Sequence, residues 1–246
     1  MAPLENTVDV SVVLPAYNES GNLRPLVGEI ADALDGRAYE VIVVDDGSTD
    51  DTRARLVAMK ADFPALRVLA HRTNAGQSRA VRTGILAARG DIIATLDSDG
   101  QNDPADLPGM LDQLTRADAP DTLAMVGGRR VKRRDTAAKR LGSRVGNGVR
   151  KRLLHDEADD TGCGIKVFRR EAFLRLPYFD HIHRYLPALM LREGYACEYR
   201  DVNHRERGEG ESKYTNFGRL KVSVNDLRGV RWLLSRARNP GGWDEV

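Results

Sequence analysis

Short runs of apolar residues alternate with amphipathic stretches along the first hundred residues of the chain. Four runs rich in valine, isoleucine and leucine end in polar loops and predict strands, at 9–17, 39–47, 66–71 and 91–100. The stretches between them predict helices, at 20–35, 51–60 and 76–89. Near-continuous apolar strands that alternate with helices are typical of a parallel sheet covered on both faces. The pattern therefore predicts an α/β fold.

The second half of the chain has a less regular pattern. We predict helices over 136–154, 181–194 and 217–238, a strand leading into a helix within 159–173, and a strand over 195–203. In the last helix apolar residues recur at three- and four-residue steps among arginines, which indicates an amphipathic helix. We therefore predict one domain, residues 1–214, and an amphipathic helical appendage, residues 215–246. The appendage would pack on the domain, contact a second copy in a homo-oligomer, or lie on a membrane surface.

Carboxylates follow two of the predicted strands. Asp45 and Asp46 end the second strand, and Asp97 and Asp99 follow the fourth. In open parallel sheets ligands bind outside the carboxyl ends of the strands, so these side chains lie where a ligand would be held. Two carboxylates spaced as Asp-x-Asp suit Mg²⁺ or Mn²⁺, and Gln101 adds a neutral oxygen. Ordinary surface turns contain the same residues, so this motif is weak by itself.

Two further motifs suit a nucleoside. Asp46 can accept hydrogen bonds from a nucleobase or a ribose, and Tyr17 and Glu19 add an aromatic ring and a carboxylate after the first strand. The alternative is that both motifs are strand–turn–helix connections with capping residues, such as Ser20. A cap does not require both Asp45 and Asp46, which favours the ligand-binding interpretation.

Together the motifs resemble a known family. The segments PAYNE, VVDDGSTD, NAGQSRAVRTGILAARGD and LDSDGQNDP, in this order, are similar to those of the inverting nucleotide-sugar glycosyltransferases of family two. The segments VGGRR, DDTGCGIKVFRRE and RGEGESKY resemble the polyprenyl-phosphate (dolichol-phosphate mannose synthase-like) branch of that family. The resemblance runs from Val10 to Tyr214. It implies a GT-A nucleotide-sugar-binding fold with a mostly parallel central sheet and helices on both faces.

The resemblance implies binding residues at matching positions of this chain. For the nucleotide sugar it implies Pro15, Tyr17, Glu19, Val44, Asp46, Asp97, Ser98, Arg129, Arg207 and Lys213. For a divalent metal ion, Mg²⁺ or Mn²⁺, it implies Asp97, Asp99 and Gln101. For the acceptor phosphate we expect Arg140, Ser143 and Arg144. The chain departs from the branch at Ser98 and Gly100, where alanine and leucine are usual.

Three residues are expected to be catalytic. Asp99 and Arg129 would neutralise the charge that develops on the nucleoside diphosphate leaving group. Asp160 would orient the acceptor or stabilise the charge that develops on the sugar, with Asp159 as the alternative if the alignment shifts by one residue. Of the five histidines we expect only His204 to lie near a site.

Charge is unevenly distributed along the chain. The formal net charge is only +2, but the stretch 129–152 carries eleven lysines or arginines against one aspartate. A solvated helix face is one interpretation. Nucleic-acid binding is disfavoured, because no aromatic residue is interleaved with these charges. We favour contact with anionic headgroups and a lipid phosphate.

The composition limits the setting of the protein. Two cysteines, Cys163 and Cys197, form neither a disulfide framework nor a metal cluster. The first residues lack the features of a secretory signal, and no window approaches eighteen apolar residues. We therefore expect a cytoplasmic protein that associates peripherally with the inner face of the membrane.

The expected function is transfer of a hexose from a nucleotide sugar to a polyprenyl or dolichyl phosphate, with inversion and with a divalent metal. We expect mannose from GDP-mannose first, and glucose or another UDP-linked hexose second. A lipid phosphate has a second pKa of about 6 and needs no strong base to act as nucleophile. One alternative class is a haloacid-dehalogenase-like phosphotransferase with Asp97 as nucleophile, although about ninety residues precede the motif and Gln101 follows it. Another is a non-catalytic module that binds lipid or nucleic acid.

Overall fold

A computed structural model describes residues 8–131, 148, 150–156, 158, 160–205 and 216–238, with the side chains of the last segment described from 224 onward. Six of the residues expected in the site lie outside the described residues: Arg140, Ser143, Arg144, Asp159, Arg207 and Lys213.

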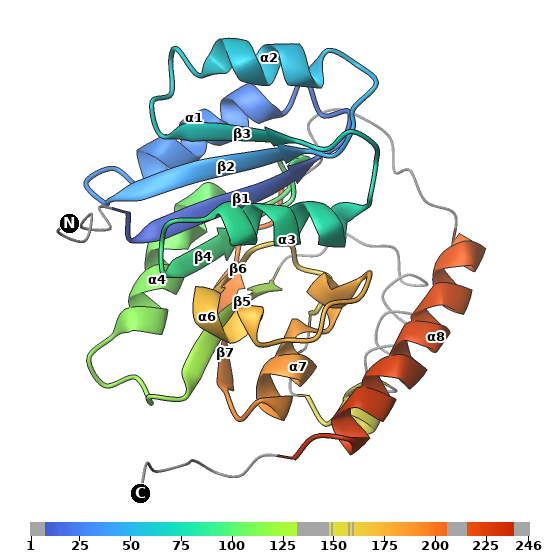
Figure 1. Ribbon diagram of the computed structural model, residues 1–246. Helices are drawn as coiled ribbons and strands as arrows, with labels where there is room; N and C mark the ends of the chain where they lie inside the picture. The colour runs from blue at the N-terminus through green and yellow to red at the C-terminus, as the bar shows by residue number, and fades with distance from the viewer. Residues whose placement is uncertain are drawn as a thin grey trace, which may run out of the picture.

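Seven strands form one sheet in the order β3-β2-β1-β4-β6-β5-β7 (Figure 1). The strands are β1 (Val10–Ala16), β2 (Tyr39–Asp45), β3 (Leu66–Ala70), β4 (Ile92–Thr95), β5 (Leu123–Arg130), β6 (Lys166–Arg169) and β7 (Ala196–Val202). Strands β3, β2, β1 and β4 pair in parallel, as do β5 and β7. Among the described strands, only β6 runs antiparallel to its neighbours, β4 and β5. The predicted mostly parallel sheet is confirmed.

Helices cover both faces of this sheet. One face carries α1 (Leu23–Ala33), α2 (Thr52–Met59) and α4 (Leu107–Thr115), and the other carries α3 (Gln77–Ala87), α6 (Arg170–Leu174) and α7 (Leu186–Arg192). Because both faces are covered, the side chains of a central strand are buried whichever way they point, and Val12, Val13 and Leu14 of β1 are each 0% exposed. Two short 3₁₀ helices, η1 (Pro104–Asp106) and η2 (Ile182–Arg184), precede α4 and α7.

The structure also differs from the predicted elements. Helix α4 and strand β5 were not among the elements predicted from the pattern. The predicted helix over 181–194 begins with η2, before which His181 adopts a left-handed conformation with φ of 64°. This conformation is not helical, so the side chains on either side of it do not follow a helical repeat.

The predicted C-terminal helix is present as α8 (Asn216–Ser235), and it packs beside α7 (Figure 1). Val230 is 0% exposed and belongs to the core on the α3 and α7 face, where Leu227 and Leu234 also pack. Nε of Arg192 donates to the carbonyl of Leu233 at 3.2 Å. One face of α8 is therefore covered by the domain. Among the described helices, none is long and apolar enough to cross a bilayer.

Candidate active site

Six of the described strands end at one edge of the sheet. The carboxyl ends of β1, β2, β3, β4, β5 and β7 lie there with the amino end of β6, because β6 runs in the opposite direction. The loops that leave these strands carry the predicted motifs. The common strand direction thus brings together residues that are separated by more than a hundred positions in the sequence.

The carboxylate of Asp46 holds the loop between β3 and α3. Its Oδ1 accepts from the amide of Ala75 at 2.9 Å and lies 2.6 Å from Nδ1 of His71. Its Oδ2 accepts from the amide of Gly76 at 2.8 Å. A carboxylate has about four acceptor positions, so these contacts leave room for a donor from a ligand. Asp46 organises the loop, and its contact with a nucleoside stays a prediction.

Asp45, by contrast, is a structural residue. It is fully buried, and it accepts from the amide of Ser48 at 2.9 Å and from Nε of Arg53 at 2.7 Å. Burial by itself raises the pKa of Asp45, but the hydrogen bonds from Ser48 and Arg53 outweigh burial and hold the pKa below its ordinary value.

The loop after β1 is tied to the loop after β2. Oδ1 of Asn18 accepts from the amide of Thr49 at 2.8 Å, and the amide of Glu19 donates to Oγ1 of Thr52 at 3.0 Å. Tyr17 and Glu19 remain partly exposed at the edge of the sheet. Val44 is 0% exposed within the core, so its side chain supports the site from beneath and cannot reach a ligand.

The metal motif is built as a tight loop after β4. Ser98 Oγ donates to the carbonyl of Pro15 at 2.8 Å, which ties this loop to the end of β1. Oδ1 of Asp99 accepts from the amide of Gln101 at 3.1 Å. Oδ1 of Asp97 accepts from Nε2 of Gln77 at 2.8 Å. Ser98 therefore positions the two aspartates, and its own side chain is buried.

The two aspartates are suited to a divalent cation. Burial raises the pKa of Asp97, and the neighbouring charge of Asp99 raises it further. A cation would relieve both costs. In the described part of the chain, no cluster of three or more histidine, cysteine, aspartate or glutamate side chains completes a cage. Mg²⁺ usually takes only one or two protein carboxylates and fills its other positions with water and substrate phosphates, so Asp97 and Asp99 fit it.

Neighbouring arginines of β5 take different positions. Nε of Arg129 donates to Asp201 of β7 at 2.6 Å, on the exposed side of the strand pair. Arg130 points to the other side, as alternate strand residues do. It donates from Nε and Nη2 to the two oxygens of Asp160, each at 2.6 Å. The arginine that meets Asp160 is therefore Arg130. The resemblance implies that Arg129 meets the phosphates of the nucleotide sugar, and this contact stays a prediction.

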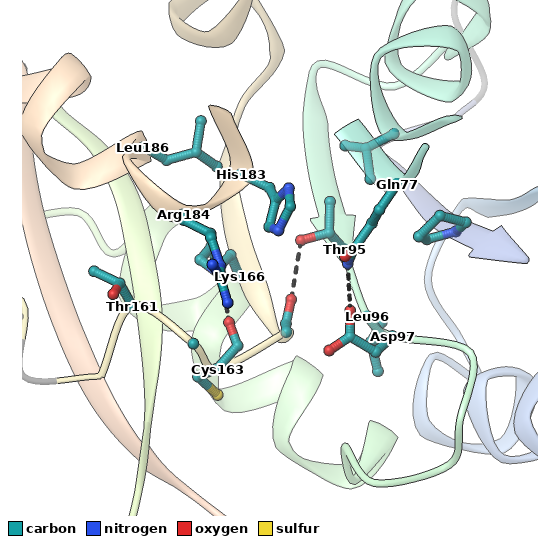
Figure 2. Close-up of a pocket in the computed structure, with 14 residues that line it drawn as sticks. Gln77, Thr95, Leu96, Asp97, Thr161, Cys163, Lys166, His183, Arg184 and Leu186 are labelled. Carbon is teal, nitrogen blue, oxygen red and sulfur yellow. Dashed lines mark hydrogen bonds between the residues drawn. The ribbon is translucent and has the colours of Figure 1, made fainter. Parts of the chain in front are cut away.

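A cavity of about 170 Å³ opens beside Asp97. Its walls come from the ends of β1 and β4, the start of α3, the loop 161–164, the start of β6 and the segment 183–186. Figure 2 shows Lys166 and Arg184 on one side of the cavity, with Gln77 and Asp97 on the other. A single buried water needs only about 15 Å³ of such a cavity. The cavity therefore has room for a small ligand.

Gly164 allows the loop 161–164 to reach the metal motif. A Cβ atom at this position would lie 2.3 Å from Oδ2 of Asp97 and 2.6 Å from Oδ1 of Asn102. Its carbonyl also accepts from Oγ1 of Thr95 at 3.3 Å (Figure 2). The absence of a side chain at Gly164 thus brings the loop after Asp160 against the aspartates.

The sequence motifs did not identify several cavity residues. Lys166 is 6% exposed, and its ammonium donates to the carbonyl of Cys163 (Figure 2). Burial lowers the pKa of Lys166, while nearby Cys163 and Asp97 oppose that shift. A lysine inside the otherwise apolar run IKVF was the signal that could have found it. His183 also lines the cavity, which corrects the expectation that His204 alone lay near a site.

We predict that His183 makes the protein less stable in mild acid. Its Nδ1 lies 2.7 Å from Oγ of Ser78, and burial, with help from Lys166 and Arg184, lowers its pKa to about 3. Between pH 6.5 and 3 the unfolded chain therefore binds a proton at this histidine that the folded protein does not. The free energy of unfolding should fall as the pH falls through this window, and it should be restored above pH 6.5.

Urea unfolding at pH 7.5 and pH 5 checks this prediction. The loss of stability between the two pH values should be smaller in His183→Gln, which cannot titrate. An equal loss in the variant and the wild type would contradict it.

Comparison with known proteins identifies the family. The fold and the site define a nucleotide-sugar-binding protein of the GT-A class. The sequence model described as "Glycosyl transferase family 2" matches residues 11–176. The chain belongs to this family and is a glycosyltransferase. This membership argues against the phosphotransferase and the non-catalytic module that the sequence left open.

Two curated relatives illustrate the similarity. The chain is 32% identical over 241 residues to a dodecaprenyl-phosphate galacturonate synthase of Rhizobium johnstonii, covering 96% of this chain and 70% of the relative. It is 34% identical over 216 residues to an undecaprenyl-phosphate 4-deoxy-4-formamido-L-arabinose transferase of Shewanella sediminis. That match covers 85% of this chain and 63% of the relative, so the chain spans less than two thirds of the second protein.

Solved structures share the fold. Glucosyl-3-phosphoglycerate synthase from Mycobacterium tuberculosis, in complex with Mn²⁺, UDP-glucose and phosphoglyceric acid, has a TM-score of 0.68 and 21% sequence identity. The match covers 95% of this chain and 82% of that one. The GT-A fold expected from the sequence is confirmed.

Proposed function

We propose that this glycosyltransferase moves a sugar from a nucleotide sugar to a polyprenyl phosphate, with inversion at the anomeric carbon. The observation that carries the proposal is the cavity that begins at Asp97. It lies between Asp97 and the loop 161–164, which follows Asp160, and so provides adjacent places for a diphosphate and a sugar. The two relatives are named for polyprenyl-phosphate acceptors, which supports the same acceptor here.

The donor is proposed to be UDP-linked. The names of the relatives contain galacturonate and 4-deoxy-4-formamido-L-arabinose, and the similar structure contains UDP-glucose. Neither relative is named for mannose, and the similar structure contains a UDP-sugar, which supports a UDP-sugar rather than GDP-mannose, the first expectation from the sequence. Asp46, with one acceptor position left, is the proposed partner of the base or ribose, and Tyr17 and Glu19 would flank it.

The proposed reaction is one displacement. A phosphate oxygen of the lipid attacks the anomeric carbon while the bond from this carbon to the diphosphate breaks, and the nucleoside diphosphate leaves. A divalent ion held by Asp97 and Asp99 would neutralise charge on the leaving group. Gln77 and Ser98 hold these aspartates in place. Arg130 fixes Asp160 through two hydrogen bonds, which keeps a carboxylate beside the sugar site.

A transfer assay tests the proposal. Purified protein, undecaprenyl phosphate in mixed micelles and Mn²⁺ are incubated with radiolabelled UDP- or GDP-sugars, and lipid-linked label is extracted. Sugar phospholipid from a UDP-sugar is the expected product. The proposal fails if no donor yields lipid-linked sugar while the sugar is transferred to another acceptor and the nucleoside diphosphate is released.

We further propose that α8, in the predicted appendage 215–246, rests on the membrane surface through its outer face. Val224 and Trp232 are 41% and 59% exposed, and Arg228, Arg231 and Arg236 are exposed beside them. Each arginine near an anionic surface contributes about 1 kcal/mol. Replacing all three arginines by glutamine should therefore weaken binding to phosphatidylglycerol vesicles by roughly 10²-fold.

Vesicle sedimentation measures this effect, with phosphatidylcholine vesicles as the uncharged control. These substitutions are preferable to deleting α8, because deletion would uncover Val230 and the core beneath it. If the variant and the wild type bind the vesicles equally, α8 has no role at the membrane and instead packs on the domain or contacts a second copy of the chain.

A further inference from the structure

The cavity beside Asp97 has more positive charge than a neutral sugar requires. Lys166 and Arg184 both line it, and within the described part of the chain neither forms an ion pair with a carboxylate. Both lie close enough to His183 to lower its pKa. Among the described residues of the lining, Asp97 is the only acidic one, and it is assigned to the metal ion.

Burial makes the charge of Lys166 costly, and the nearby carboxylates of Asp97 and Asp160 compensate for this cost only in part, because the pKa of Lys166 is still lowered. Lys166 is 6% exposed, and its ammonium has only the carbonyl of Cys163 as a described hydrogen-bond acceptor. An ammonium has three donors, so two remain for a ligand. A buried cation is retained where an anion compensates it, and Arg184 adds a guanidinium that suits a carboxylate.

We propose that this cavity takes an anionic sugar, a nucleotide-linked uronic acid, whose carboxylate is bound by Lys166 and Arg184. This inference rests on the proposed function, because it takes the cavity to be the sugar site of that reaction. The diphosphate at Asp97 and Asp99 places the sugar in the adjoining cavity, and the sugar carboxylate then faces the two cations. The rest of the lining offers smaller polar contacts to hydroxyl groups, from Gln77, Thr95 and Thr161.

Pairs of donors that differ in one group test the proposal. In each pair one sugar has a carboxylate where the other has a hydroxymethyl group. Calorimetric titrations with Mn²⁺ would use three pairs: UDP-galacturonate and UDP-galactose, UDP-glucuronate and UDP-glucose, and GDP-mannuronate and GDP-mannose. In at least one pair the uronate should bind about 30-fold more tightly, as expected for a charge-assisted hydrogen bond. No preference for the uronate in any pair would overturn the proposal.

Variants of Arg184 then test whether the preference for the uronate arises in this cavity. Arg184 is only partly buried, so Arg184→Gln should fold, and it should reduce the ratio of affinities within the preferred pair to below about 5-fold. Arg184→Lys keeps the charge and should retain part of the preference. The matched control is Arg175→Gln, an exposed arginine paired with Glu171 outside the cavity, which should keep the wild-type ratio. An unchanged ratio in Arg184→Gln would overturn the assignment.

The acceptor phosphate is the other anion that two cations could bind. If they bind it, Arg184→Gln should raise the KM for undecaprenyl phosphate by the same factor with every donor and leave the donor ratio unchanged, which would overturn the proposal. Failure of the proposed function is a separate result. In that case a uronate would still bind preferentially, but no sugar would appear on the lipid.

Discussion

Replacing Asp99 by asparagine should reduce kcat by about 10³-fold, because a metal ligand that neutralises the leaving group contributes several kcal/mol to the transition state. The substitution removes a negative charge with little change in shape. The asparagine Oδ1 can still accept from the amide of Gln101, so the loop after β4 should remain folded. Binding of nucleotide in the presence of Mn²⁺ should weaken as well.

Asp103, a third aspartate of the same loop, provides the control. Asp103 accepts from the amide of Ala105 at 3.0 Å and pairs with Arg205 at 2.6 Å, and it has no proposed contact with the metal. Asp103→Asn should therefore lose far less activity than Asp99→Asn. Initial rates at limiting Mn²⁺ and the melting temperature of each variant are the measurements. If Asp99→Asn keeps wild-type activity at limiting Mn²⁺, the assignment of Asp99 as a metal ligand is wrong.

Gly164→Ala should lower kcat/KM by about 10²-fold, since a displacement near 1 Å in a catalytic site has an effect of that size. The new Cβ would lie 2.3 Å from Oδ2 of Asp97, and Oδ1 of Asn102 would be 2.6 Å away. One of these groups or the backbone of the loop has to move. Overpacking of this kind also costs about 1–3 kcal/mol of stability.

Gly162 is the matched control for this substitution. A Cβ at Gly162 would first meet Nη2 of Arg130, at 3.3 Å, so this guanidinium would have to shift by only a few tenths of an ångström. Gly162→Ala should therefore lose far less melting temperature and kcat/KM than Gly164→Ala. If Gly164→Ala retained full activity, the close approach of the loop to Asp97 would have no role in catalysis.

The paired loops also explain how the site is held before a ligand binds. Asp46 binds the loop 71–76, Asn18 binds Thr49, and Ser98 binds the end of β1. The loop after β7 joins them, since the amide of Arg205 donates to the carbonyl of Gln101 at 2.9 Å. Hydrogen bonds between loops of different strands thus fix the positions of Asp97 and Asp99 without a metal ion.

Much of this protein is determined by the sequence alone. The apolar runs of β1 and β2 are long because both faces of a parallel sheet are covered, and this periodicity is local and therefore visible in the chain. Carboxylates such as Asp97 and Asp99 directly follow a strand, so their place at the ligand-binding edge follows from strand direction. The order of the motifs was enough to indicate the family before any contact was known.

Only the tertiary structure decided which side chains meet. Arg129 and Arg130 are neighbours in sequence, but the pairing of β5 with β7 puts Arg129 opposite Asp201 and leaves Arg130 to Asp160. Arg184 lies in no motif, and Lys166 lies in the segment DDTGCGIKVFRRE without an assigned role. They reach one cavity because β6 runs antiparallel and η2 precedes α7. The physical reason is that the charge of a cavity is the sum over segments that are distant in the chain, whereas a sequence pattern reports only on neighbours.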